Sequence, residues 1–230
     1  MYTFLAFAIA FHLTSFSDRV FAKSNEPTSQ VQSPLDADIA LNQLKSGNQR
    51  FLTGEIRKDG QAIKDVERLA KSQSPNSILL SCSDSRVPPE TVFDQKLGEM
   101  FTVRSAGESL SPQAIGSIEF AIEKLGTHLV VVLGHTNCGA VKAAVETFGG
   151  KSAGSENLDL LVHDIHPRLK SKFDPVHPSK DLKNESWLNA RGVAKDLLSR
   201  SKIISSAAQS GKVKLQVGLY DLATGKVEFE

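Results

Sequence analysis

The spacing of apolar and polar positions along the chain predicts short strands separated by helices. Two continuous apolar runs, 77–81 and 129–133, are typical of strands buried on both faces of a sheet, and Gly134 is expected to end the second. Helical spacing predicts helices over residues 36–51, 62–70, 111–125, 137–148, 157–172 and 186–209. Further strands are expected over residues 100–103, 213–220 and 226–229.

This order of elements predicts an α/β fold with a mostly parallel central sheet flanked by helices. In such sheets ligands bind beyond the carboxyl ends of the strands. Residues that directly follow the two buried strands are therefore the first candidates for a functional site.

The amino-terminal segment has a different composition from the rest. Residues 4–11 form an unbroken apolar run, too short for the roughly 20 residues of a membrane span but long enough for a secretory signal peptide. Ala22 ends a suitable cleavage site, although no Lys or Arg precedes the run. We expect a signal peptide at 1–22, a flexible linker at 23–34 and a single domain at 35–230. The mature chain would then be periplasmic or secreted, without a membrane span; the alternative is a leader that is retained.

Net charge excludes one large class of function. The 230 residues include 27 Lys and Arg against 26 Asp and Glu, a formal charge of +1. Nucleic-acid-binding domains usually carry a basic excess, so we expect no nucleic-acid partner. The two cysteines allow one disulfide at most, which excludes a disulfide-stapled scaffold.

Both cysteines follow predicted central strands. Cys82 comes directly after the strand at 77–81, and Cys138 follows the strand at 129–133 with His135 three residues before it. Because parallel strands end at the same edge of a sheet, the three side chains are expected to meet there. Thiolate and imidazole are the usual ligands of zinc, and three protein ligands leave a fourth position open, as in catalytic zinc sites.

Two charged residues accompany Cys82. In an extended chain, Cys82, Asp84 and Arg86 would face one way, and Asp84 could offer its carboxylate to the fourth metal position. Two other interpretations of the cysteines remain open, a Cys82–Cys138 disulfide and a pair of buried core thiols.

The segments at 82–86 (CSDSR) and 135–139 (HTNCG) resemble the paired metal motifs of the β-class carbonic anhydrases. Residues 41–51, 87–90, 101–107 and 218–225 are also similar to segments of that family, so the resemblance covers the chain from about residue 35 to its end. It implies the family's fold, with an amino-terminal helical arm. It also implies one Zn²⁺ per subunit and a homodimer or homotetramer.

The resemblance assigns roles by position. It implies that Cys82, His135 and Cys138 bind zinc. Asp84 and Arg86 would form a catalytic pair in which Asp84 either holds Arg86 or becomes a fourth metal ligand in a closed state.

The resemblance also implies a substrate pocket, formed by Gln73, Phe101, Phe120 and Gly139. Gln73 would hydrogen-bond substrate, often from the partner subunit, and Gly139 would bring a backbone N–H near it. Phe120 replaces a tyrosine that many members have. Ser105 and Glu108 replace asparagines common in the family, which affects loop contacts.

The implied activity is the reversible hydration of carbon dioxide to bicarbonate and a proton, by attack of zinc-bound hydroxide. Two alternatives keep the same fold. One is hydrolysis of a sulfur analogue, carbonyl sulfide or carbon disulfide, and the other is a non-catalytic bicarbonate-binding zinc module with Asp84 held on the metal. His163 and His166 have metal-like spacing but no third partner, and we expect them on a helix surface.

Overall fold

A computed structural model describes residues 35–170, 174 and 177–230. The predicted signal peptide and linker lie outside the described residues. Five strands form one sheet: β1 (Ser77–Ser81), β2 (Met100–Arg104), β3 (Leu129–His135), β4 (Lys214–Tyr220) and β5 (Val227–Phe229). Their order in the sheet is β2-β1-β3-β4-β5, and only β5 pairs antiparallel to its neighbour. The predicted α/β fold with a mostly parallel sheet is confirmed.

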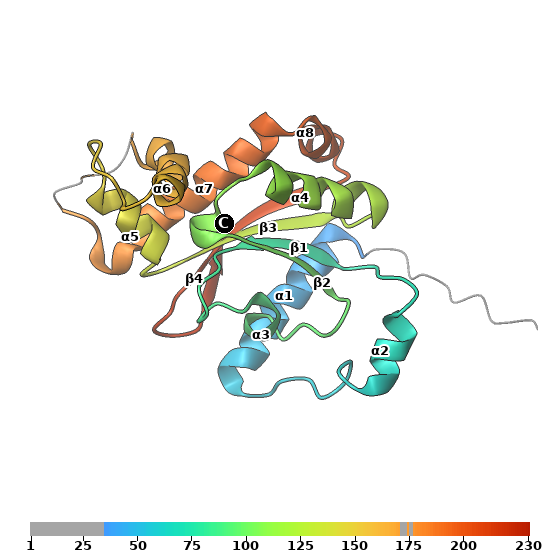
Figure 1. Cartoon of the computed structure of the whole chain (residues 1–230). Helices are drawn as coiled ribbons and strands as arrows, with labels where there is room; N and C mark the ends of the chain where they lie inside the picture. The colour runs from blue at the N-terminus through green and yellow to red at the C-terminus, as the bar shows by residue number, and fades with distance from the viewer. Residues whose placement is uncertain (1–34, 171–173, 175–176) are drawn as a thin grey trace, which may run out of the picture. The chain divides into compact units, whose positions relative to one another are not determined.

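Helices surround the sheet on both faces (Figure 1). In the described part of the chain they are α1 (Ala37–Thr53), α2 (Ile63–Leu69), α3 (Pro89–Val92), α4 (Pro112–Lys124), α5 (Gly139–Glu146), α6 (Glu156–Leu169), α7 (Lys183–Arg200) and α8 (Lys202–Gln209), with 3-10 turns η1 (Ala106–Glu108) and η2 (Lys180–Leu182). None of these helices combines the length and apolarity that a bilayer span requires.

The period-two alternation of β1 and β3 divides the core into two layers. Ile78 and Val132 face one layer, which α4, α7 and α8 cover. Leu79 and Val131 face the other layer, where Leu44 of α1 is buried. Both strands are buried along their whole length, as their continuous apolar runs predicted.

Helix α1 begins and ends at residues suited to those positions. The Asp36 carboxylate accepts hydrogen bonds from the N–H groups of Asp38 and Ile39, at 2.9 and 3.3 Å. Gly54 ends the helix with a φ of 75°, a left-handed conformation that favours glycine. The helix predicted from spacing is confirmed here to within two residues at its carboxyl end.

Two boundary predictions were wrong. Gly134 does not end β3 but pairs with Leu219 of β4, and a Cβ there would lie 3.2 Å from Ala190 of α7. The glycine therefore allows α7 to pack closely on the strand. The helix predicted over 186–209 is two helices, because Ser201 has an extended backbone and its hydroxyl caps α8 by accepting from the N–H of Ile204.

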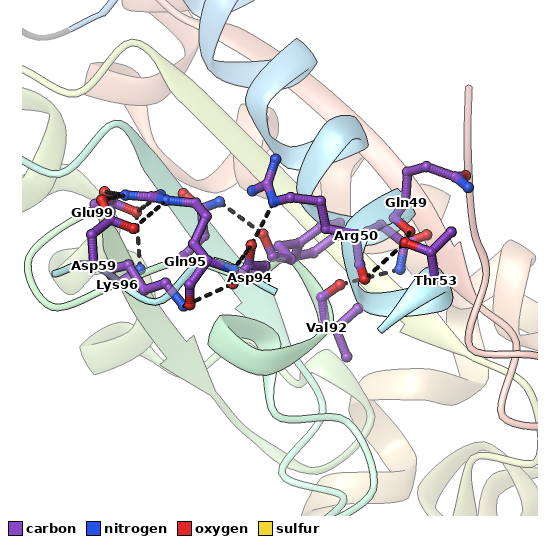
Figure 2. A network of polar contacts seen from close by, with 12 residues as sticks. Gln49, Arg50, Thr53, Asp59, Val92, Asp94, Gln95, Lys96 and Glu99 are labelled. Atoms are coloured by element: carbon purple, nitrogen blue, oxygen red, sulfur yellow. Dashed lines mark hydrogen bonds and ion pairs between the residues drawn. The ribbon is translucent and has the colours of Figure 1, made fainter. Parts of the chain in front are cut away.

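A network of charged side chains fastens α1 to the loop that follows α3 (Figure 2). The buried Asp94 carboxylate accepts from Arg50 Nε at 2.5 Å, from Lys96 Nζ at 2.8 Å and from the backbone N–H of Arg57. Arg57 makes a two-pronged ion pair with Glu99, 2.9 Å for each nitrogen. Burial by itself would raise the pKa of Asp94, but the bonds from Lys96 and Arg50 outweigh it and lower the pKa to about 2.

Candidate metal centre

Three ligand-type side chains converge at the carboxyl edge of the sheet. Cys82 directly follows β1, His135 is the last residue of β3, and Cys138 is the amino-terminal cap of α5. Their ligand atoms lie within 4.8 Å of one another, and all three residues are buried. The neighbouring parallel strands β1 and β3 bring together residues 53 positions apart in the sequence, which is the juxtaposition that the strand positions predicted.

Both cysteines are free. Their sulfurs are 3.9 Å apart, too far for a disulfide, and the disulfide interpretation is wrong for this structure. Hydrogen bonding from Cys138 lowers the pKa of Cys82, and the same contact raises the pKa of Cys138. A divalent cation would balance the charge of two thiolates at this buried position.

The imidazole of His135 is oriented for coordination. Its Nδ1 is 2.9 Å from the carbonyl oxygen of Thr136, so Nδ1–H donates to that carbonyl. Nε2 is then the atom with the lone pair, and among the described residues it is buried without a hydrogen-bond partner. A buried polar atom without a partner is costly, which points to a group that completes the site. Two thiols and this nitrogen fit Zn²⁺.

Asp84 and Arg86 stand beside the cluster. Arg86 donates to both carboxylate oxygens of Asp84, from Nε at 2.9 Å and from a terminal nitrogen at 2.7 Å. The bonds from Arg86 lower the pKa of Asp84, which stays ionised. Asp84 Oδ2 is 3.9 Å from His135 Nε2, so the carboxylate lies at the edge of the metal position while Arg86 holds it.

The extended backbone assumed for 82–86 is not what joins these two residues. The N–H of Val87 donates to the Asp84 carbonyl at 3.0 Å, which makes a turn at Ser85 and Arg86. The Arg86 guanidinium folds back over that turn to reach Asp84. The pair that the resemblance implied is present, and it forms across a turn, so the extended chain expected over 82–86 is wrong.

The structure brings only part of the predicted pocket to the cluster. Gly139 is the first residue of α5, next to Cys138, where an N–H has no partner within the helix and a Cβ would meet open space. Phe101 lies on β2, paired with Ile78 at the far end of β1 from Cys82, and is partly buried.

Two other pocket residues lie elsewhere in this chain. Gln73 is exposed and precedes β1, whereas Cys82 follows it. Phe120 of α4 is 49% exposed. Their pocket roles stay predictions.

Two further residues lie around the cluster: Arg104 had no predicted role, and Glu108 was expected to affect loop contacts. Arg104, the last residue of β2, donates to the carbonyls of Cys82 at 3.0 Å and Asp84 at 2.8 Å, so it holds the loop that carries both. Glu108 is fully buried, and burial raises its pKa to about 8. A charged residue at a strand end was a signal for Arg104; nothing local in the sequence indicates the burial of Glu108.

The two histidines without a predicted role lie on α6. His163 is exposed, as expected, but His166 is partly buried, and its Nε2 is 2.8 Å from the carbonyl of Ala144. The bond ties α6 to α5 and explains the position of His166 without a ligand.

Comparisons with known proteins agree with this geometry. The family model described as carbonic anhydrase matches residues 77–227. The chain is 33% identical over 188 residues to carbonic anhydrase 2 of Mycobacterium tuberculosis, covering 81% of this chain and 89% of that protein. It is 34% identical to a carbonic anhydrase of Mycolicibacterium smegmatis, covering 82% and 91%.

Solved structures show the same fold. The β-carbonic anhydrase of Coccomyxa in complex with acetazolamide is 25% identical with a TM-score of 0.64, covering 73% of this chain and 78% of that one. A β-carbonic anhydrase of Aspergillus fumigatus matches with a TM-score of 0.63 at 24% identity, covering 84% and 89%.

The chain belongs to the carbonic anhydrase family, and the matching fold places it in the β class. It is a zinc-dependent enzyme that interconverts carbon dioxide and bicarbonate.

Proposed function

We propose that Cys82, His135 and Cys138 hold one zinc ion per subunit and that Asp84 and Arg86 assist the hydration of carbon dioxide. The observation that carries the proposal is the unpartnered, buried Nε2 of His135, which lies within 4.8 Å of both thiol sulfurs. When bound, zinc lowers the pKa of a water molecule, as it is known to do in carbonic anhydrases with three histidine ligands.

Asp84 has two tasks in this mechanism. Its carboxylate can accept a hydrogen bond at the open coordination position, since Oδ2 is 3.9 Å from His135 Nε2. Because Arg86 donates to both oxygens, the carboxylate stays ionised and is held in the ion pair. The structure therefore favours an open site, in which solvent can take the fourth position, over a non-catalytic module closed by Asp84.

The other residues of the site position substrate. Gly139 follows Cys138 at the start of α5, where the helix dipole favours the negative charge of bicarbonate. Phe101 lies at the opposite end of β1 from Cys82, so an apolar surface that it offers to carbon dioxide would have to come from the partner subunit. The released proton has to reach solvent, and the described residues show no dedicated histidine beside the cluster other than His135 itself.

The test is metal content together with the carbon dioxide hydration rate of purified protein. We expect one zinc per chain, loss of both zinc and activity in Cys82→Ser, and retained zinc with reduced activity in Asp84→Asn. Full activity in Asp84→Asn would contradict the role of that carboxylate.

We also propose that the enzyme is a homodimer or homotetramer. Helix α2 has no buried residue, and its Ile63 and Val66 are 74% and 49% exposed. Nearby Gln73 lies at the opposite end of β1 from Cys82, so a Gln73 that touches substrate would have to be the partner's Gln73.

The sedimentation coefficient of the Ile63→Asp variant tests this assembly. Leu160→Asp on α6 is the control, because Leu160 is also an exposed apolar residue, at 63%. We expect dissociation and lower activity only in Ile63→Asp. An unchanged sedimentation coefficient would contradict the use of α2 as an interface.

Export is the last part of the proposal. The apolar run at 4–11 and the small-residue site ending at Ala22 support a signal peptide that is removed from the mature enzyme. Amino-terminal sequencing of the secreted or periplasmic protein should begin at Lys23. A mature chain that begins at Met1 would contradict this.

A further inference from the structure

A buried polar chain runs from the metal cluster to the outer surface of α6 and α7. It begins at Cys82, whose Sγ accepts a hydrogen bond from the backbone N–H of Gly107 at 3.3 Å. The carbonyl of Gly107 in turn accepts from the side-chain amide of Asn189, at 2.8 Å. One glycine residue thus lies between a metal ligand and a side chain of α7.

Both polar atoms of the Asn189 side chain are hydrogen-bonded. Asn189 is completely buried, and its Nδ2 also donates to Glu108 Oε2 at 3.0 Å. Its Oδ1 accepts from Arg168 of α6, at 3.2 Å. Arg168 is itself fixed by Asp164 at 2.9 Å and Asp196 at 2.8 Å.

The backbone at the Gly107 turn is in a conformation that needs such support. Gly107 and Glu108 have φ angles of 63° and 53°, and the second is unfavourable for a residue with a side chain. A Cβ on Gly107 would lie 2.8 Å from Ile165 and 2.9 Å from Ala140. The turn is therefore tightly enclosed, and Asn189 provides the bonds that link its two residues.

Arg168, at the far end of this series of hydrogen bonds, packs against Gly192 of α7. A Cβ on Gly192 would lie 2.5 Å from the Arg168 side chain, so only glycine leaves room for the arginine between α6 and α7. The two helices and the turn form one packed unit behind the thiol of Cys82.

We propose that Asn189 is a positioning residue for the metal centre, which fixes Gly107 so that its N–H points at the Cys82 sulfur. The inference rests on the proposed function in assuming that Cys82 binds the metal. A hydrogen bond to a coordinating sulfur draws electron density from it and restricts its direction, and loss of such outer contacts typically weakens metal binding about 10- to 100-fold.

Asn48 supplies a matched control. It is also a buried asparagine whose Nδ2 bonds two backbone carbonyls, those of Val92 at 3.2 Å and Gly225 at 3.0 Å. Its partners belong to the α1 side of the molecule and include no metal ligand. Asn48→Ala and Asn189→Ala therefore each remove a buried side-chain amide that donates two hydrogen bonds and accepts one, at two separate places.

The experiment measures zinc affinity by competition with a chromophoric chelator, and the thiolate-to-metal charge-transfer band of the cobalt(II)-substituted full chain. We expect Asn189→Ala to bind zinc at least about tenfold more weakly and to shift the cobalt band. In Asn48→Ala we expect a zinc affinity within about twofold of wild type and an unshifted cobalt band. If Asn189→Ala does not fold, Asn189→Asp keeps the acceptor for Arg168 and replaces the amide donor with a carboxylate oxygen, which when ionised cannot donate to the Gly107 carbonyl, with the same expected result.

Three results would overturn the proposal: wild-type affinity and band in the Asn189 variant, an equal change in the Asn48 variant, or a weaker affinity without a band shift, which would indicate general destabilisation. Wild-type protein that binds neither metal would instead contradict the proposed function.

Discussion

Two buried polar clusters in this molecule differ in how completely their hydrogen-bonding capacity is used. Around Asp94, both carboxylate oxygens accept from cationic side chains and from a backbone N–H (Figure 2). At the carboxyl edge of the sheet, His135 Nε2 has no partner among the described residues, although it is equally buried. The first cluster is complete in itself, whereas the second requires another group.

The contrast indicates that the Asp94 cluster stabilises the fold, whereas the cluster with His135 serves the chemistry of the site. A satisfied buried network fixes the positions of elements, here α1 against the loop after α3, and exposes no reactive atom. An unsatisfied set of soft ligands costs free energy unless a metal compensates it. Changes in the first cluster should therefore alter stability, and changes in the second should alter metal binding and activity.

The largest effect is expected from His135→Ala. Removal of one of three ligands should abolish tight zinc binding and reduce the hydration rate to the uncatalysed level, because the remaining two thiols do not suffice for a catalytic site. Stopped-flow hydration assays and metal analysis on the same sample measure both. Substantial activity in the variant would contradict the assigned ligand.

Asp94→Asn should strongly affect stability and leave metal binding unchanged. Lys96 would remain buried without its charge partner, at a cost of about 3–5 kcal/mol in the free energy of unfolding. Denaturant unfolding measures it, with zinc content as the control. A zinc content that falls in the folded variant would show that the two clusters are not independent.

The pH dependence sharpens the same prediction. The folded pKa of Asp94, about 2, lies below its ordinary value, so on acidification the unfolded chain takes up the proton first. The stabilisation is complete above about pH 5 and is lost as the pH falls towards about 2. Wild-type stability should fall more steeply than that of Asp94→Asn in this range.

Arg86→Ala should lower activity about 10- to 100-fold with little effect on folding. Without the guanidinium, Asp84 is free to bind the metal, and it competes best when hydroxide is scarce. The loss should therefore be greatest at low pH, which a pH–rate profile measures. An equal loss at every pH would contradict the holding role of Arg86.

The smallest effect is expected at the rim of the Asp94 network. Glu99 is partly exposed and binds Arg57, which is also partly exposed, so Glu99→Gln should cost about 1 kcal/mol or less. Thermal unfolding at low and high salt measures this, and the cost should shrink as salt is added. A cost as large as that of Asp94→Asn would show that burial of the ion pair does not determine which substitution destabilises the protein more.

Sequence patterns were sufficient where one local signal determined the outcome. Continuous apolar runs located β1 and β3, and the residues after them located the metal cluster, because parallel strands end at one edge. Helical spacing located α1 to within two residues at its carboxyl end.

What the sequence did not reveal depends on contacts between distant segments. Gly134 resembled a strand end, but its role is to admit α7. The break at Ser201 comes from a cap inside a sequence with helical spacing throughout. The partners of Asn189 come from α6 and η1, up to 82 positions away, and no local periodicity predicts them.

Zinc K-edge X-ray absorption of the purified enzyme tests the central claim most directly, because it counts the sulfur ligands of the metal. We predict two sulfur ligands, one imidazole nitrogen and one further light-atom ligand from solvent. A spectrum without sulfur, or with a fully protein-derived shell that includes a carboxylate and no solvent, would contradict the open site formed by Cys82, His135 and Cys138.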